Sequence, residues 1–140
     1  MTDIKRILVP VDGSETAERA IDEAVAIAEI YGSEIHILYV ANINQLAINA
    51  CLSDAILEAV NKAGNEILEK AASKIPDKIN VITTSETGSP SVTITDFADE
   101  IKADLVVVGS RGLGLVKGVL LGSVSQYVVE HAPCPALVVK

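Results

Sequence analysis

Residues 109–125, GSRGLGLVKGVLLGSVS, hold five of the chain's nine glycines and directly follow the apolar run LVVV. Glycine lets the backbone approach a ligand closely, and successive backbone N–H groups in such a loop can donate to phosphate oxygens. Ser123 can open a helix near the end of this glycine-rich segment, and a helix start adds N–H donors and a positive dipole end. Arg111 and Lys117 give the segment positive charge. The pattern predicts a site for a small anionic ligand that carries phosphate.

A second candidate loop, Asp12-Gly13-Ser14, follows the first apolar run, ILVPV. In an open parallel sheet, ligands bind beyond the carboxyl ends of the strands, where the strand order reverses. If the two apolar runs form neighbouring strands, this loop and the glycine-rich segment border one crevice. Asp12 can also be a simple turn or capping residue, and Gly109 and Gly112 can simply end a strand. The Lys117 ammonium group is expected to be a solvated loop charge.

Known phosphate-binding fingerprints do not fit the glycine-rich segment. A Walker loop requires Gly-Lys followed by Ser or Thr, whereas this chain has the reversed order Lys117-Gly118. The GxGxxG pattern fails because Lys117 stands three residues after Gly114. A dinucleotide fingerprint would also follow the first strand, where this chain has VDGSE.

The histidines and cysteines form no catalytic or metal-ligating pattern. His36 alternates with apolar residues of a predicted strand and has no evident partner, and His131 suits the last turn of a helix, where positive charge is favourable. Cys51 and Cys134 lie far apart without a CxxC motif, which indicates two thiols in a reducing compartment better than a disulfide. We therefore expect neither a catalytic residue nor a metal site made by side chains.

The elements that must position these loops alternate between strands and helices. Apolar runs bounded by turn residues predict strands at 4–11, 34–40, 79–86, 105–108 and 135–140. Periodicity and capping residues predict helices at 14–31, 53–75, 90–102 and 123–131. This alternation implies βαβ units, so residues 1–140 are expected to form one doubly wound α/β domain with a parallel sheet and helices on both faces. The helical residues expected to face the core are Ala17, Ala20, Ile21, Ala24, Ala28 and Tyr31 in the first helix, and Ile56, Val60, Ala63, Ile67 and Ala71 in the second.

Charge is distributed unevenly along the chain. The net charge is −8, yet residues 102–140 carry four basic and two acidic residues. The acidic total argues against a nucleic-acid or anionic-membrane binder, and the scarcity of aromatic residues argues against a stacking surface for single strands. The first residues contain no signal-like apolar segment, and no apolar run approaches ~18 residues. We therefore expect a cytoplasmic protein without a membrane span.

One spacing in the glycine-rich segment matches a known family. Gly109-x2-Gly112-x9-Gly122-Ser123 resembles the nucleotide-binding pattern of the universal stress protein family. The resemblance runs along the whole chain, through the segments ILVPVDGSE, GSP, ADLVVVGSRG and GSVSQYVVEHAPCPALVV. The family implies a five-stranded parallel sheet of order 3-2-1-4-5, which places the first and fourth strands side by side, as the two loops require. Family members that keep the glycine pattern bind ATP, and this chain keeps every position of it.

The resemblance also implies roles for particular residues. Asp12 is expected to bond the ribose hydroxyls, with Pro10 and Val11 beside the nucleoside. Val40 is expected to meet adenine through its backbone. Arg111 occupies a variable position of the pattern, and a phosphate role is inferred for it from its charge alone. The residues expected around the ribose and phosphates are Val108, Gly109, Gly112, Gly122, Ser123, Val124 and Ser125.

The resemblance favours a nucleotide-responsive regulator of the stress response. Such a protein would bind ATP, or AMP or ADP, with Mg²⁺ held mainly by phosphate oxygens and water, and would hydrolyse ATP slowly at most. A first alternative is an enzyme of the related adenine-nucleotide α-hydrolase group, but those enzymes carry an SGGxDS-type loop where this chain has VDGSE. A second alternative is an interaction module without nucleotide. Nucleotide that copurifies with the protein would exclude this second alternative.

The last predicted strand, 135–140, is expected to join two copies of the chain. It would be an edge strand in the order 3-2-1-4-5, and ALVVK is apolar and uncharged until Lys140. Edge strands usually carry a charge, a bulge or a cover, whereas Pro135 protects only the start of this one. Antiparallel pairing with the same strand of a second copy would satisfy its backbone groups, and the resemblance implies the same homodimer. The sequence does not indicate a downstream protein partner.

Overall fold

Strands and helices alternate as predicted in the computed structural model, which describes residues 3–42, 54–112 and 121–140. In chain order the elements are β1 (Arg6–Val11), α1 (Glu15–Tyr31), β2 (Glu34–Ala41), α3 (Asp54–Ser73), β3 (Val81–Thr87), α4 (Pro90–Glu100), β4 (Leu105–Gly109), α5 (Ser123–His131) and β5 (Ala136–Val139). The predicted helix cap Ser53, the thiol of Cys51 and the loop charge of Lys117 lie outside the described residues.

The five strands form one parallel sheet in the order β3-β2-β1-β4-β5, which confirms the predicted topology. β1 lies at its centre, where Ile7 pairs with Ile35 of β2 on one side and with Leu105 of β4 on the other. The strand order therefore reverses between β1 and β4. Because all strands are parallel, the loops that follow β1 and β4 open at the same edge of the sheet.

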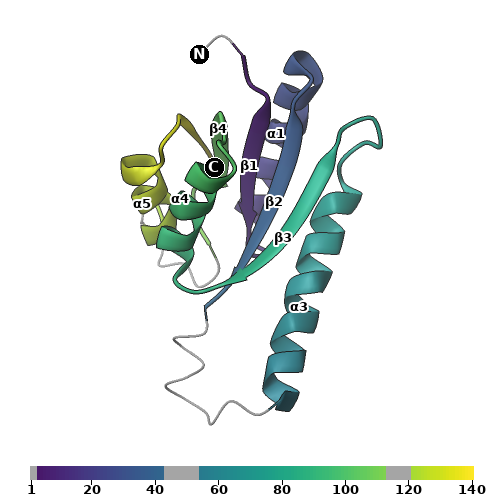
Figure 1. The fold of residues 1–140 in the computed structure, drawn as a ribbon, viewed down its shortest axis with the longest axis vertical. Helices are drawn as coiled ribbons and strands as arrows, with labels where there is room; N and C mark the ends of the chain where they lie inside the picture. The colour runs from purple at the N-terminus through teal and green to yellow at the C-terminus, as the bar shows by residue number, and fades with distance from the viewer. Residues whose placement is uncertain (1–2, 43–53, 113–120) are drawn as a thin grey trace.

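Helices cover both faces of the sheet (Figure 1). α1 and α3 pack on one face over a buried cluster that includes Ile7, Val9 and Ile37. α4 and α5 pack on the other face over a cluster that includes Leu8 and Val106. Consecutive residues of β1 thus serve opposite cores, as the alternation of side chains along a strand requires. No helix in the described part of the chain is long and apolar enough to cross a membrane.

Helix α1 begins and ends where the sequence predicts. The Ser14 side chain caps it by accepting the N–H of Ala17 at 3.3 Å, and Gly32 ends it with a left-handed φ of 69°. The predicted apolar face is buried except at its last position, since Tyr31 is 47% exposed. The prediction for Tyr31 is wrong because it is the last residue before the cap, beyond Ala28, the last buried residue of α1.

Helix α3 presents a partly different face to the core from the one predicted. Ala63 is exposed, whereas Gly64, Leu68 and Ala71 are buried. The difference arises at Gly64, where a Cβ would lie 2.7 Å from the ring of Tyr39. The helix backbone therefore approaches β2 at a glycine that apolar periodicity does not count.

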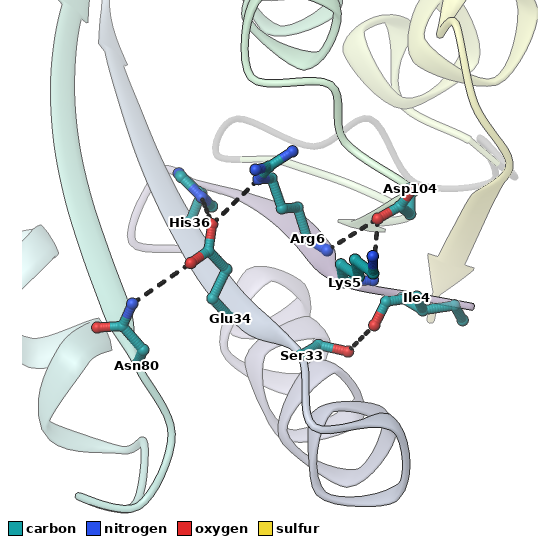
Figure 2. Close-up of polar contacts among 8 residues, drawn as sticks. All are labelled: Ile4, Lys5, Arg6, Ser33, Glu34, His36, Asn80 and Asp104. Carbon is teal, nitrogen blue, oxygen red and sulfur yellow. Dashed lines mark hydrogen bonds and ion pairs between the residues drawn. The ribbon is translucent and has the colours of Figure 1, made fainter.

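A polar network ties the amino ends of the strands together, at the edge of the sheet opposite the two loops (Figure 2). Glu34 of β2 accepts from the Arg6 Nε of β1 at 3.3 Å, lies 2.9 Å from His36 Nε2, and accepts from the Asn80 amide that precedes β3. Asp104, which precedes β4, accepts the backbone N–H of Arg6 at 3.0 Å. The expectation that His36 has no partner is therefore wrong. The hydrogen bond with His36 lowers the pKa of the Glu34 carboxyl group.

Strand β5 forms one edge of the sheet and leaves alternate backbone groups facing outward. The carbonyls of Pro135 and Val139 face β4, because they accept from Val106 at 3.0 Å and from Ser110 at 2.7 Å. Backbone groups of successive strand residues point to opposite sides. The N–H and C=O groups of Ala136 and Val138 therefore point away from β4, where the strand order of the described residues places no further strand.

Candidate functional site

A cleft of about 450 Å³ lies beyond the carboxyl ends of the central strands. It brings together all twelve residues that the sequence predicts for the ligand site. They are Pro10, Val11, Asp12, Val40, Val108, Gly109, Arg111, Gly112, Gly122, Ser123, Val124 and Ser125. They come from β1, β2, β4, the loops after β1 and β4, and the start of α5. The neighbouring placement of β1 and β4 is what joins them.

Sequence reasoning missed five further residues that line the cleft, namely Ser14, Ala17, Leu38, Pro90 and Ile94. Leu38 stands two residues before Val40 on β2, so period-two alternation could have identified it. Pro90 and Ile94 lie one helical turn apart at the start of α4, a spacing visible in the sequence once the sheet order is known.

The two sides of the cleft differ in chemistry. The side formed by β2 and α4 is apolar and is made by Leu38, Val40, Pro90 and Ile94. The side formed by β4 and α5 contains the basic residue Arg111 and the glycine positions of the pattern. The cleft therefore offers a surface for a flat apolar group beside donors for an anion.

Asp12 lies between these two sides, after β1, with its carboxylate partly fixed. Its Oδ1 accepts the backbone N–H of Ser14 at 2.9 Å. Its Oδ2 lies against Gly112, where a Cβ would come within 2.7 Å of that oxygen. The turn role that the sequence left open is thus real, but it uses one carboxylate oxygen. The other oxygen lies at the cleft, beside the glycine-rich segment.

The glycines of the pattern differ in how much room the surrounding protein leaves for a Cβ atom. A Cβ on Gly109 would lie 2.5 Å from Thr16 Oγ1 and 2.8 Å from the Ala17 nitrogen, so packing against α1 alone requires glycine there. A Cβ on Gly122 would meet no described atom closer than 3.5 Å, which is ordinary contact. The described protein atoms therefore explain Gly109 but leave Gly122 without a packing reason.

The start of α5 opens into the cleft. Gly122 is its N-cap with extended backbone, and no side chain caps the helix among the described residues. The N–H groups of the first turn are those that a helix cannot satisfy internally, and they favour an anion. Ser123 is exposed there, whereas buried Ser125 donates its hydroxyl proton to the Gly109 carbonyl at 2.6 Å. Ser125 thus holds α5 against β4.

Almost the whole length of the chain matches one known family of proteins. The model of the universal stress protein family covers residues 3–140. The chain belongs to the universal stress protein family. A universal stress protein of Methanocaldococcus jannaschii is 34% identical over 139 residues, which cover 97% of this chain and 82% of that protein.

Solved structures of the universal stress protein family share the fold. UspA of Lactobacillus plantarum aligns over 100% of both chains with a TM-score of 0.77 and 29% identity. A universal stress protein solved in complex with cAMP aligns over 99% of both chains with a TM-score of 0.76 and 29% identity. That relative holds an adenine nucleotide.

The remaining titratable candidates of this universal stress protein lie away from the cleft. The Nδ1 atom of His131 lies 3.0 Å from the Tyr127 carbonyl in the last turn of α5, and its ring stacks on the Tyr127 ring. Cys134 is a half-buried free thiol, and burial raises its pKa. No group of three His, Cys, Asp or Glu within residues 3–42, 54–112 and 121–140 could hold a metal ion.

Proposed function

We propose that this universal stress protein binds adenine nucleotides, ATP with Mg²⁺ foremost, in the cleft beyond β1 and β4. The observation that carries the proposal is the convergence on one cleft of all twelve residues that the family pattern implies. The relative solved with cAMP adds independent support. AMP and ADP carry the same adenosine group and would occupy the same cleft.

The chemistry of each side of the cleft suggests how the nucleotide would lie. Adenine would sit against the apolar side formed by β2 and α4, with the Val40 backbone at its edge. Asp12 would accept from the ribose hydroxyls. The phosphates would face the start of α5, where Ser123 and Arg111 add a hydroxyl and a positive charge. Mg²⁺ would be held mainly by phosphate oxygens and water.

Binding fits this cleft better than fast hydrolysis. The titratable side chains among the described residues that line it are Asp12 and Arg111, and one oxygen of Asp12 is bonded to Ser14. Arg111 offers only donors, and Asp12 is proposed to accept from the ribose hydroxyls, so neither side chain is assigned as a general base for attack by water. We therefore propose a regulator whose nucleotide occupancy is read by a partner protein and whose ATP hydrolysis is at most slow.

Titration calorimetry on nucleotide-free protein tests the proposal. Mg-ATP is expected to give a saturable heat with one site per chain. Mg-CTP is expected to bind about tenfold more weakly, because a pyrimidine leaves part of the apolar side uncovered. Equal affinity for both nucleotides would contradict an adenine site, and the lack of saturable heat with either would contradict the proposal as a whole.

We also propose that two copies pair through β5. The outward N–H and C=O groups of Ala136 and Val138 support an antiparallel ladder across a two-fold axis. Light scattering at micromolar concentration should give about twice the chain mass of 14.7 kDa. Val138→Pro should shift the protein toward monomer, because it removes a donor that faces the partner and none that faces β4.

Val138→Ala is the matched control for this variant, since it keeps the N–H group and should remain dimeric. A parent protein that scatters as a monomer would refute the pairing. So would a Val138→Pro protein that stays as dimeric as the parent.

A further inference from the structure

Three consecutive backbone carbonyls at the start of the glycine-rich segment, those of residues 109–111, are each held by a donor from elsewhere in the fold. In chain order, the donors are the hydroxyl of Ser125, the N–H of Gly122 and the hydroxyl of Thr16. The first two donors belong to α5 and its cap, whereas Thr16 belongs to the first turn of α1. The orientation of these peptide groups is therefore set by two different helices.

The Thr16 hydroxyl fixes the peptide group between Arg111 and Gly112. In a planar trans peptide, the C=O of one residue and the N–H of the next point in opposite directions. Because Thr16 draws the Arg111 carbonyl toward α1, the N–H of Gly112 is directed away from α1. The Gly112 nitrogen lies 3.7 Å from the point that a Cβ of Gly122 would occupy, and both residues line the cleft. The Gly112 N–H thus lies beside the start of α5.

The packing around Thr16 leaves room for its hydroxyl to reach the Arg111 carbonyl. Thr16 is 5% exposed, and a Cβ on Gly109 would lie 2.5 Å from its hydroxyl oxygen. The absence of a side chain at Gly109 therefore makes room for the hydroxyl. The Ser14 hydroxyl donates to the same carbonyl over a longer distance of 3.5 Å, and its oxygen accepts the Ala17 N–H as the helix cap.

We propose that Thr16 is a positioning residue for the phosphate side of the cleft. Its hydroxyl orients the Arg111–Gly112 peptide so that the Gly112 N–H donates to a phosphate group together with the start of α5. This inference rests on the proposed function, because it concerns the same nucleotide. It assigns to α1 a role that the glycine pattern does not contain.

The affinities for ATP and for adenosine, which lacks phosphate, test the inference in two variants. Thr16→Val keeps the shape of the side chain but removes the hydroxyl, and Thr16→Ser keeps the hydroxyl. Thr16→Val is expected to lower ATP affinity about tenfold and to leave adenosine affinity unchanged, because only the phosphate side is reoriented. Thr16→Ser is expected to retain the affinity of the parent for both. In nuclear magnetic resonance spectra, the Gly112 amide signal should shift on addition of Mg-ATP in the parent and in Thr16→Ser, and not in Thr16→Val.

Thr95→Val is the matched control. Thr95 is also buried, and its hydroxyl bonds only within α4 among the described contacts. This variant should carry a similar loss of stability without any change in the ratio of ATP to adenosine affinity. The inference is overturned if Thr16→Val binds ATP like the parent, or if it loses ATP and adenosine affinity by the same factor. A parent protein that binds neither compound would instead refute the proposed function, and this inference with it.

Discussion

Replacing Gly122 with valine is expected to lower ATP affinity at least about a hundredfold while the protein stays folded. The added side chain would stand beside the Gly112 nitrogen at the N-cap of α5, where the phosphates are proposed to lie. Losing two charge-assisted hydrogen bonds of about 1.5–3 kcal/mol each accounts for a factor of this size. The fold should survive because a Cβ meets no atom of the described residues closer than 3.5 Å and the backbone of Gly122 is extended. Calorimetry and a thermal melt measure the two effects separately.

Ser89→Val is the matched control for this variant. Ser89 is the N-cap of α4, with extended backbone and no capping hydrogen bond from its side chain, and it does not line the cleft. The same side chain at a second helix start should therefore leave ATP affinity unchanged. If Gly122→Val binds ATP as tightly as the parent does, the phosphates do not lie against the start of α5.

Changing Asp12 is expected to remove the preference for a nucleotide with ribose hydroxyls. The parent should bind ATP at least about a hundredfold more tightly than 2′,3′-dideoxy-ATP, because each of the two hydroxyls donates to a carboxylate in a bond of about 1.5–3 kcal/mol. Asp12→Asn keeps an oxygen that can accept from the Ser14 N–H, so the turn after β1 should persist. It removes the negative charge that strengthens these bonds, and the preference should fall toward one.

Asp12→Ala provides the second arm of this experiment, since it removes both the turn acceptor and the carboxylate. It should also abolish the preference, and in addition it should lower the melting temperature. Should the parent and both variants discriminate equally between the two nucleotides, Asp12 serves only the turn. The affinity ratio makes this comparison independent of any general loss of binding.

Much of the fold and of the cleft could be predicted because both depend on local patterns that a parallel sheet then brings together. Asp12 and Gly112 are distant in the chain, yet Asp12 directly follows one predicted strand and Gly112 lies four residues after the end of another. Once β1 and β4 are neighbours, the parallel direction places both residues at one edge. Strand alternation and turn residues therefore predicted the parallel sheet and the two loops, whereas the strand order and most of the site residues were implied by the family resemblance.

The features that sequence reasoning missed depend on contacts between elements. The packing of Gly109 on Thr16 and of Gly64 on Tyr39 requires the relative position of a helix and a strand, which periodicity does not give. His36 and Glu34 stand two residues apart on β2, but Glu34 also accepts from Arg6 of β1, so this contact depends on how the two strands lie side by side.

Thermal unfolding of nucleotide-free protein, with and without Mg-ATP, tests most directly whether the cleft binds ATP. At a free ATP concentration about a hundred times the dissociation constant, binding to the folded state alone adds ~2.7 kcal/mol to the free energy of unfolding. For a chain of 140 residues, this corresponds to a rise in melting temperature on the order of 10 °C. A rise that grows with the logarithm of ATP concentration is the predicted result, and a melting temperature that does not move at millimolar Mg-ATP would contradict it.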